Sequence, residues 1–269
     1  MAGVAVCGAM GRMGRAILAI LAENPQGLTL SAAVEAAGHP LLGKDAAAVA
    51  GGGRAGVTVT DDAGGAIAAA DVTIDFSNAE SSVRNAFLAA EAGKPIVIGA
   101  TGIKAEQIDR IREAARKTAI VQSPNMSVGV NLMFRVAADV ARVLGEDYDV
   151  EIVETHHRFK KDAPSGTAVK LADVVASALG RDMGEVGVYG RKGMVGERTR
   201  GEIGVFAMRS GDVVGEHTLV FGGIGERFEI THRAHSRDTF ARGAVRAAAW
   251  ALGKPPGLYD MADVLGFGR

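Results

Sequence analysis

Short apolar runs alternate with amphipathic stretches along the first half of the chain. The runs are three to seven residues long and predict β-strands at residues 4–7, 28–34, 57–60, 72–76, 96–98 and 119–121. Between them, recurring apolar positions predict helices at residues 12–23, 80–92 and 104–117, and the Ala- and Gly-rich segment 46–56 is predicted to be a loop. Almost continuously apolar strands are typical of a parallel sheet that helices cover on both faces.

The pattern changes after residue 125. A long helix is predicted at 130–144, followed by a strand at 150–155 and a second helix that begins after Ser165 and ends near 179. Strands follow at 204–208, 218–221 and 227–231 with few helices between them, which indicates an α+β domain with an open mixed sheet. The last helix, 239–252, has no partner nearby in the sequence. We therefore expect an α/β protein with a first domain of residues 1–127 and 236–269 and a second domain of residues 128–235.

Composition excludes several classes of protein. The 269 residues carry 30 Lys and Arg against 31 Asp and Glu, so the net charge of −1 argues against a nucleic-acid-binding surface. No run of 18 apolar residues predicts a membrane span, and no basic segment ahead of an apolar stretch predicts a signal peptide. The single cysteine, Cys7, lies in an apolar run and is predicted to be buried, as suits a reducing compartment. These features predict a soluble, cytoplasmic protein.

Three glycines directly after the first predicted strand indicate a nucleotide site. Gly8, Gly11 and Gly14 form a G-x-x-G-x-x-G turn that opens a helix, and Glu35 follows 21 positions after Gly14. In dinucleotide-binding folds such a turn lets the pyrophosphate approach the helix N-terminus, and the acidic residue meets a ribose hydroxyl. Arg12 is expected beside the pyrophosphate. The alternative is an ordinary glycine-rich turn between a strand and a helix.

The stretch 154–168 concentrates proton donors and cations at the end of a predicted strand. His156 can donate a proton near neutral pH, and Lys160 offers a cation for a carboxylate. The amides of Ser165, Gly166 and Thr167 begin a helix and can bind an anion. The stretch predicts a site for a small anionic molecule that gains a proton. A solvated basic strand end before a capped helix is the alternative.

The other histidines and aromatic residues carry less information. Five of the six histidines lie in the second half, and His232 and His235 form an i, i+3 pair, but no carboxylate or cysteine spacing completes a metal site. We therefore expect structural or exposed histidines and no metal. Phe240 and Trp250 on the last predicted helix are expected in the core.

The sequence resembles the dihydrodipicolinate reductase family of bacterial and plant lysine biosynthesis across nearly the whole chain. The stretch 154–168 is the most specific part of the resemblance. The matching segments are residues 8–14, 75–77, 99–102, 123–131, 156–168, 215–217 and 257–261.

The resemblance implies a homotetrameric, NAD(P)H-dependent oxidoreductase with a Rossmann-type dinucleotide-binding domain and a domain for substrate binding and tetramerisation. Its reaction is the reduction of 4-hydroxy-tetrahydrodipicolinate, a small dicarboxylate, to tetrahydrodipicolinate in the diaminopimelate route. It implies that His156 is the proton donor and Lys160 a second donor or carboxylate partner, while His157, Gly166 and Thr167 bind the substrate carboxylates. The implied cofactor contacts are Gly8, Ala9, Met10, Gly11, Arg12, Met13, Glu35, Gly99, Ala100, Thr101, Ser123, Pro124, Asn125 and Met126.

Two expectations follow from these residues. Adjacent residues of a regular strand point to opposite faces, so His156 and His157 can serve one site only where the strand ends; Lys160 is then expected on a loop that folds back towards Gly166. Many relatives carry Arg after the ribose-binding Glu, whereas this chain has Ala36. We therefore expect NADH to be preferred, with NADPH use possible through Arg12 or His39.

Two other functions stay open on the sequence alone. One is a different two-domain Rossmann reductase that acts on an amino or imino acid. The other is a non-catalytic NAD-binding regulator, against which the proton donors His156 and Lys160 argue.

Overall fold

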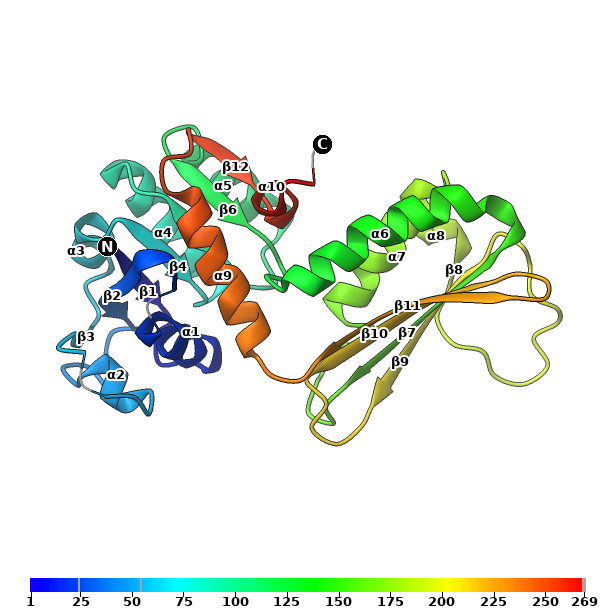
Figure 1. Cartoon of the computed structure of the whole chain (residues 1–269), viewed down its shortest axis with the longest axis horizontal. Helices are drawn as coiled ribbons and strands as arrows, with labels where there is room; N and C mark the ends of the chain where they lie inside the picture. Colours follow the sequence, from blue (N-terminus) through cyan, green and yellow to red (C-terminus); the bar gives the residue numbers. More distant parts are fainter. Residues whose placement is uncertain (24, 54, 268–269) are drawn as a thin grey trace. The chain divides into compact units, whose positions relative to one another are not determined.

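The structure is a computed structural model that describes residues 1–23, 25–53 and 55–267. The chain divides into two compact units, one of Met1–Val128 with Arg237–Arg269 and one of Gly129–Ser236. Figure 1 shows the helices and strands of both units and labels them where there is room. No helix among the described residues is long and apolar enough to cross a membrane.

The first unit is built on a seven-stranded sheet in the order β12-β6-β5-β4-β1-β2-β3. Every neighbouring pair of its strands is parallel. The strands are β1 (Ala2–Cys7), β2 (Leu28–Val34), β3 (Val59–Thr60), β4 (Val72–Asp75), β5 (Ile96–Ile98), β6 (Ala119–Gln122) and β12 (Gly257–Tyr259). The predicted parallel sheet is confirmed.

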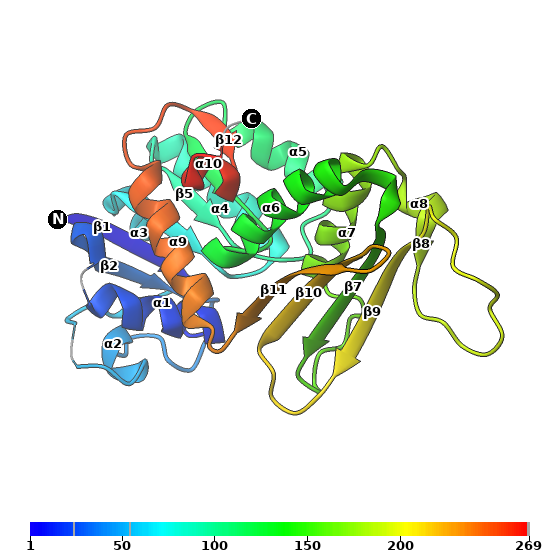
Figure 2. The same cartoon turned by 45° about the vertical axis from the view of Figure 1, so that its right-hand side comes forward.

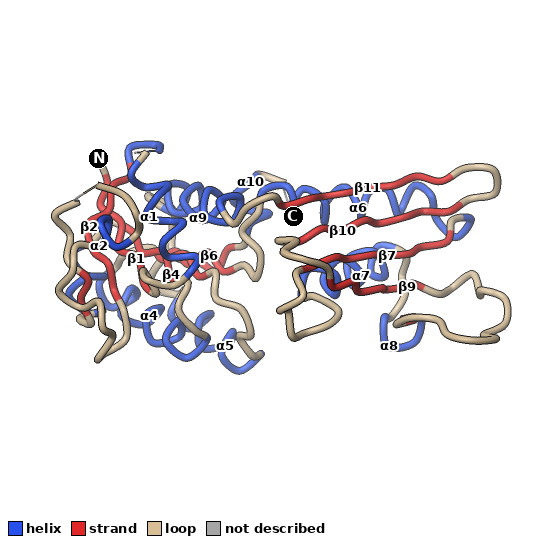
Figure 3. The backbone as a smooth tube through the Cα atoms, turned by 90° about the horizontal axis from the view of Figure 1, so that it is seen from below, coloured by secondary structure: helices blue, strands red, loops and turns tan. Residues whose placement is uncertain are grey.

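Helices cover both faces of this sheet, as the continuous apolar strands require (Figure 3). The helices α1 (Arg12–Ala22), α9 (Asp238–Ala251) and α10 (Met261–Leu265) pack on one face against Val6 and Val97. The helices α3 (Ala63–Ala69), α4 (Ala79–Ala92) and α5 (Ala105–Ala114) pack on the other against Ile96 and Ile98. Successive residues of β5 thus enter different core clusters, because strand side chains alternate between faces.

Several short elements differ from the predictions. The segment predicted as a loop contains a one-turn helix, α2 (Ala46–Val49), because the carboxylate of Asp45 accepts a hydrogen bond from Ala48 N–H. The helix α3 was missing from the predicted elements, although Asp62 caps it in the same way. The strand β12 was also missing, since three residues become a strand only by pairing with β6.

The helix α9 packs on α1, β4 and β5 within the first unit. Small buried residues, among them Ala241 and Ala244, let it approach closely. At Gly243 the backbone of α9 lies so near residue 126 that an added Cβ would lie 1.8 Å from the carbonyl oxygen of Met126.

The second unit is built on a mixed five-stranded sheet in the order β11-β10-β7-β9-β8 (Figure 2). The strand β10 is antiparallel to β7 and β11, whereas β9 is parallel to β7 and β8. The strands are β7 (Asp149–His156), β8 (Gly187–Val188), β9 (Ile203–Arg209), β10 (Gly215–Gly222) and β11 (Arg227–Ala234). The predicted open mixed sheet is therefore confirmed.

One face of the mixed sheet packs against helices α6 (Val128–Leu144) and α7 (Gly166–Ala178). Ile152 and Leu219 of the sheet and Met133 and Leu171 of the helices form this core. A short helix, α8 (Met183–Val186), follows α7.

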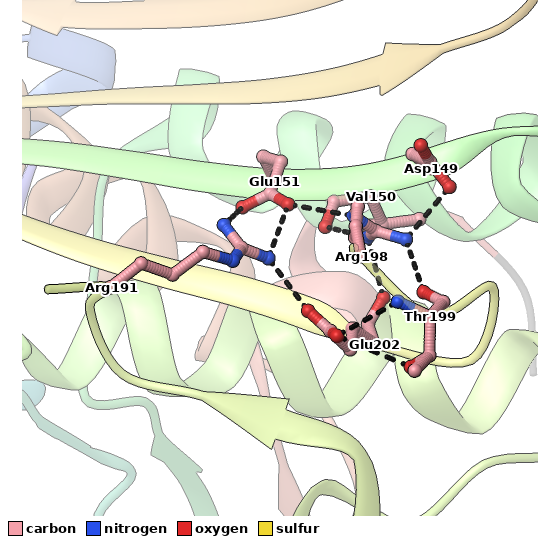
Figure 4. Close-up of polar contacts among 7 residues, drawn as sticks. All are labelled: Asp149, Val150, Glu151, Arg191, Arg198, Thr199 and Glu202. Atoms are coloured by element: carbon pink, nitrogen blue, oxygen red, sulfur yellow. Dashed lines mark hydrogen bonds and ion pairs between the residues drawn. The ribbon is translucent and has the colours of Figure 1, made fainter. Parts of the chain in front are cut away.

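The glycine-rich segment between β8 and β9 is held by ion pairs (Figure 4). Arg191 bonds to Glu151 and Glu202 at 2.9 and 2.8 Å, and Arg198 bonds to Asp149 and Glu151 at 2.7 and 2.9 Å. The hydrogen bond from Arg191 is the largest of the causes that lower the pKa of Glu202 to about 2. Charges that look scattered in the sequence therefore tie this segment to β7.

We predict that Gly243→Ala lowers the free energy of unfolding by about 1–3 kcal/mol, because the added Cβ pushes α9 away from Met126. Urea denaturation measures the change. Gly64→Ala is the matched control: Gly64 lies in α3, and its nearest atom to an added Cβ is an Asp62 oxygen at 3.7 Å. This control is expected to gain about 0.5–1 kcal/mol from better helix propensity. Equal effects of the two variants would contradict the close packing of α9.

Candidate active site

The glycine turn after β1 is folded tightly against the end of β2. Gly8 has a φ of +73°, a conformation that favours glycine, and the N–H groups of Gly8 and Ala9 both donate to Val34 O at 3.0 and 3.1 Å. A Cβ at Gly14 would lie 2.2 Å from Gly8 O, so only glycine lets α1 pack on the turn. Gly11 precedes α1 and provides no side-chain cap for its first N–H groups. This helix N-terminus can therefore bind an anion.

Two cavities of the first unit meet at this turn. One, of about 670 Å³, is lined by Gly8, Gly11 and Glu35 among others. The other, of about 410 Å³, is lined by Gly11, Arg12, Met13, Gly99, Ala100, Thr101, Pro124, Asn125 and Met126. Of the implied cofactor contacts, Ala9, Met10 and Ser123 are buried and line neither cavity.

Glu35 connects the end of β2 to the glycine turn. Its Oε1 accepts a hydrogen bond from Met10 N–H at 2.7 Å, and its Oε2 accepts one from Ala36 N–H at 3.3 Å. Ala36 is exposed and lines the same cavity as Glu35, as does Arg84 of α4. The Nδ1 of His39 is occupied by a hydrogen bond from Leu41 N–H at 3.3 Å. The carboxylate of Glu35 thus lies where a ribose hydroxyl can reach it.

A loop that follows β4 lines both cavities, although its residues were not among the predicted site residues. Phe76 and Ser77 are shared by the two cavities. The fully buried Asp75 holds this loop, because Ser77 N–H and Oγ donate to its Oδ1 at 2.8 and 2.5 Å. Burial raises the pKa of Asp75 despite these bonds. A Cβ at Gly99 would lie 2.2 Å from the ring of Phe76, so the ring can occupy this position only because residue 99 has no side chain.

The predicted core position of Phe240 is wrong. It was expected in the core, but it is only partly buried and lines the cavity that contains Arg12 and Asn125. Phe240 lies in the first turn of α9, three positions before the buried Gly243. Trp250 packs against the core cluster and against Tyr259, with ring centroids 5.1 Å apart.

In the second unit, β7 ends at His156, as predicted. The His156 carbonyl accepts a hydrogen bond from Ser210 N–H at 2.9 Å, and the chain then turns into the loop that carries Lys160. His156 Nδ1 lies 2.5 Å from Glu154 Oε2. Burial is the largest cause that lowers the pKa of His156, and Glu154 opposes it. A histidine with a lowered pKa releases its proton readily once it has been protonated.

Lys160 is half-buried on this loop and close to the histidines. Its Nζ donates to both carboxylate oxygens of Asp162, at 2.9 and 2.8 Å. Its positive charge adds to the burial that lowers the pKa of His156 and of His217. His157 contacts the Phe159 ring, and its buried Nδ1 has no hydrogen-bond partner among the described residues. No hydrogen bond between described residues joins His157 to His156.

The helix α7 begins in front of this cluster with Ser165 as its N-cap. Ser165 Oγ accepts a hydrogen bond from Ala168 N–H at 3.2 Å. Gly166 is exposed, and a Cβ built on it would meet no atom within 4 Å. The first turn, with Gly166 and Thr167, is therefore open to a carboxylate, which the positive end of the helix attracts.

His217 was grouped in the sequence analysis with structural or exposed histidines, but the structure places it beside His156. It is buried, its Nε2 lies 3.2 Å from Ser165 Oγ, and its ring meets that of His156 edge-on at 5.3 Å. Glu154 and Arg209 also belong to this cluster and were not among the predicted site residues. The alternation of β7 could have indicated Glu154, since it shares a face with His156. Among the described residues no three His, Cys, Asp or Glu side chains form a group that could hold a metal.

Comparisons with known proteins agree on one family. The family described as "Dihydrodipicolinate reductase, N-terminus" matches residues 2–126, and "Dihydrodipicolinate reductase, C-terminus" matches residues 129–265. Relatives named 4-hydroxy-tetrahydrodipicolinate reductase include that of Syntrophus aciditrophicus, 56% identical over 97% of each chain. That of Anaeromyxobacter dehalogenans strain 2CP-1 is 57% identical over 98% of this chain and 97% of its own.

Solved structures share the fold of this chain. The dipicolinate-bound dihydrodipicolinate reductase from Paenisporosarcina sp. TG-14 has a TM-score of 0.77 at 25% identity and covers 98% of each chain. An amine dehydrogenase from Mycobacterium smegmatis has a TM-score of 0.60 at 13% identity, covers 96% of this chain and 94% of its own, and shares the fold alone.

We predict that His217 makes the second unit sensitive to acid. Burial, and next the charge of His156, lower the pKa of His217 from 6.5 to about 3. Between these values the unfolded chain binds more protons than the folded chain, so the free energy of unfolding falls as the pH falls. Between pH 7 and pH 5 we expect roughly 1–2 kcal/mol of this loss to come from His217.

Urea denaturation of His217→Gln at both pH values measures that part. The variant is expected to lose less stability on acidification than the unmodified chain, whereas His235→Gln, at an exposed histidine, is expected to follow the unmodified chain. The same pH dependence in all three proteins would rule out His217 as the source.

Proposed function

Because the chain belongs to the dihydrodipicolinate reductase family, we propose that it reduces 4-hydroxy-tetrahydrodipicolinate to tetrahydrodipicolinate with NAD(P)H in the diaminopimelate route. It is thus an oxidoreductase of lysine biosynthesis. The observation that carries the proposal is the juxtaposition in the second unit of an acid, His156, with an open helix N-terminus at Gly166.

The family uses a pyridine nucleotide, and the first unit fits one. We infer that the pyrophosphate lies at the N-terminus of α1 beside Arg12 and the ribose beside Glu35. The uncapped helix start and the absence of room for a Cβ at Gly14 support this. The cavity lined by Gly99, Ala100, Thr101, Pro124, Asn125 and Met126 is proposed for the nicotinamide half. When bound, the reduced nicotinamide supplies a hydride.

The second unit is proposed to bind the substrate and provide the proton. The dihydrodipicolinate reductase from Paenisporosarcina sp. TG-14 has been solved with dipicolinate, a dicarboxylate, bound. One carboxylate fits the amides of Gly166 and Thr167. His157 offers a hydrogen-bonding group and Lys160 a positive charge. His156 is then proposed to donate a proton to the substrate.

The alternatives are less well supported. A different Rossmann reductase shares with this chain only the fold, as the amine dehydrogenase does at 13% identity. A non-catalytic regulator gives no reason for burying a histidine and a carboxylate beside an open helix start.

Assembly and location are proposed on the same basis. The face of the mixed sheet opposite α6 and α7 carries partly exposed apolar residues such as Phe206, Met208 and Val220. We propose that second units pair through this face to form a homotetramer. A free, buried Cys7 agrees with the cytoplasmic location that we propose.

The proposed acid is tested by steady-state NADH oxidation with substrate freshly made from pyruvate and aspartate semialdehyde. His156→Gln is expected to lower kcat roughly 10²–10⁴-fold with little change in NADH binding, as for the loss of a general acid. Lys160→Ala is expected to lower kcat and raise KM. Lys161→Ala, at the exposed neighbouring lysine, is the matched control. Near-normal turnover of His156→Gln would exclude this residue as the acid.

We expect NADH to be preferred, because the carboxylate of Glu35 repels a 2′-phosphate and Ala36 provides no compensating cation. Ala36→Arg is predicted to strengthen NADPH binding by about 1–3 kcal/mol, the range for a hydrogen bond to a charged group. Ala36→Gln controls for side-chain length without charge. Isothermal titration with both nucleotides and their kcat/KM values measure the effect. A tenfold preference of the unmodified chain for NADPH would contradict the prediction and direct attention to Arg84.

A further inference from the structure

Glu154 is a fully buried carboxylate that has no assigned role in the reaction. It lies in β7 two residues before His156, so both side chains project from the same face of the sheet. Its Oε2 lies 2.5 Å from His156 Nδ1 and accepts a hydrogen bond from Arg209 Nη1 at 3.0 Å. Its Oε1 accepts hydrogen bonds from Arg209 Nη2 at 3.0 Å and from Ser165 N–H at 2.9 Å.

These bonds connect the proposed acid to the proposed carboxylate site. Ser165 is the N-cap of α7, so the carboxylate that orients His156 also fixes the residue from which Gly166 and Thr167 follow. Arg209 extends the connection, because it also donates to Asp162 O at 2.6 Å and thereby holds the loop that carries Lys160. A shift of Glu154 would move the acid, the helix start and the loop together.

We propose that Glu154 is a positioning residue with two effects. It accepts a hydrogen bond from Nδ1–H of His156, so that Nε2 is the atom that donates a proton to the substrate. It also fixes the position of His156 relative to the N-terminus of α7. This inference rests on the proposed function of His156 as the acid. When the Nε2–H bond breaks, its electron pair stays on Nε2, the proton passes to the substrate, and the neutral ring keeps its Nδ1–H bond to Glu154.

The space around His156 agrees with this orientation. Gly215 of β10 is buried next to the ring, and a Cβ built on it would lie 3.0 Å from His156 Nε2. A side chain at position 215 would compete with the ring for its place. Because residue 215 is glycine, the His156 ring can adopt the orientation in which its Nδ1 bonds to Glu154.

Arg209 balances the charge of Glu154. With the guanidinium paired to the carboxylate, His156 is not held strongly in its protonated form and can release its proton. The other titratable groups near the ring are Lys160 with Asp162 on the loop, His217 on β10, and His232, which lies opposite His217 on β11. Among all the charged groups around the ring, Glu154 favours the imidazolium, whereas Arg209 and Lys160 disfavour it.

Opposite effects of two variants test the proposal. Glu154→Gln keeps the shape but removes the negative charge, so we expect the pKa of His156 to fall by roughly one unit; Arg209→Gln removes the opposing charge, so we expect it to rise by a similar amount. NMR titration of full-length protein labelled at histidine Cε1 measures these values without substrate, and the resonance missing in His156→Gln gives the assignment. Glu229→Gln and Arg227→Gln, an exposed pair on β11, are matched controls expected to leave the titration unchanged.

The pH dependence of kcat/KM provides the second readout. Its basic limb is expected to move to lower pH in Glu154→Gln and to higher pH in Arg209→Gln, a split that simple loss of structure does not produce. Unchanged titration of His156 in both variants, or shifts in the same direction, would overturn the proposal. If Glu154→Gln does not fold, Arg209→Gln decides alone: an upward shift supports the proposal and no shift overturns it. Absence of turnover in the unmodified chain would refute the proposed function, and the titration would still test Glu154.

Discussion

A charged carboxylate is stable inside a protein only when its oxygens are fully hydrogen bonded, and this requirement organises the second unit. Glu154 meets it by drawing donors from three separate elements: Arg209 of β9, Ser165 at the start of α7 and His156 at the end of its own strand. Leaving any of these bonds unmade would expose the unit to the desolvation cost of a buried charge. The geometry of the proposed acid and of the proposed carboxylate site is thus a consequence of how one side chain is satisfied.

The first unit also has a buried, hydrogen-bonded carboxylate at the end of a strand, Asp75 in β4. Asp75 is fully buried and holds the loop of Phe76 and Ser77, which lines both cavities. Both carboxylates therefore stand at strand ends and hold the backbone that follows. Loops at the carboxyl ends of parallel strands are where α/β sheets commonly bind ligands, and a buried anchor keeps such a loop in one conformation.

Glycine is required at three positions where neighbouring elements pack closely. At Gly14, Gly99 and Gly243 an added Cβ would lie 2.2 Å or less from a neighbouring atom. These glycines let α1 pack on its turn, let the Phe76 ring reach the cavity and let α9 pack on Met126. At these three positions glycine is a packing requirement, because a side chain there would displace an element that borders the cavities.

The residue pattern was sufficient to predict the parallel sheet, the mixed sheet and the glycine turn with Glu35, because these depend on local periodicity and on residue types at short spacing. The end of β7 at His156 was expected because the family resemblance places both adjacent histidines in one site. Three features could not be predicted in this way. The strand β12 pairs with β6, Phe240 borders a cavity, and Glu154 lies beside Arg209 and His217, which are 55 and 63 positions away in the sequence. Such contacts depend on which strands pair and in which register, and that choice is made by the packing of the whole unit. No local pattern of residues records it.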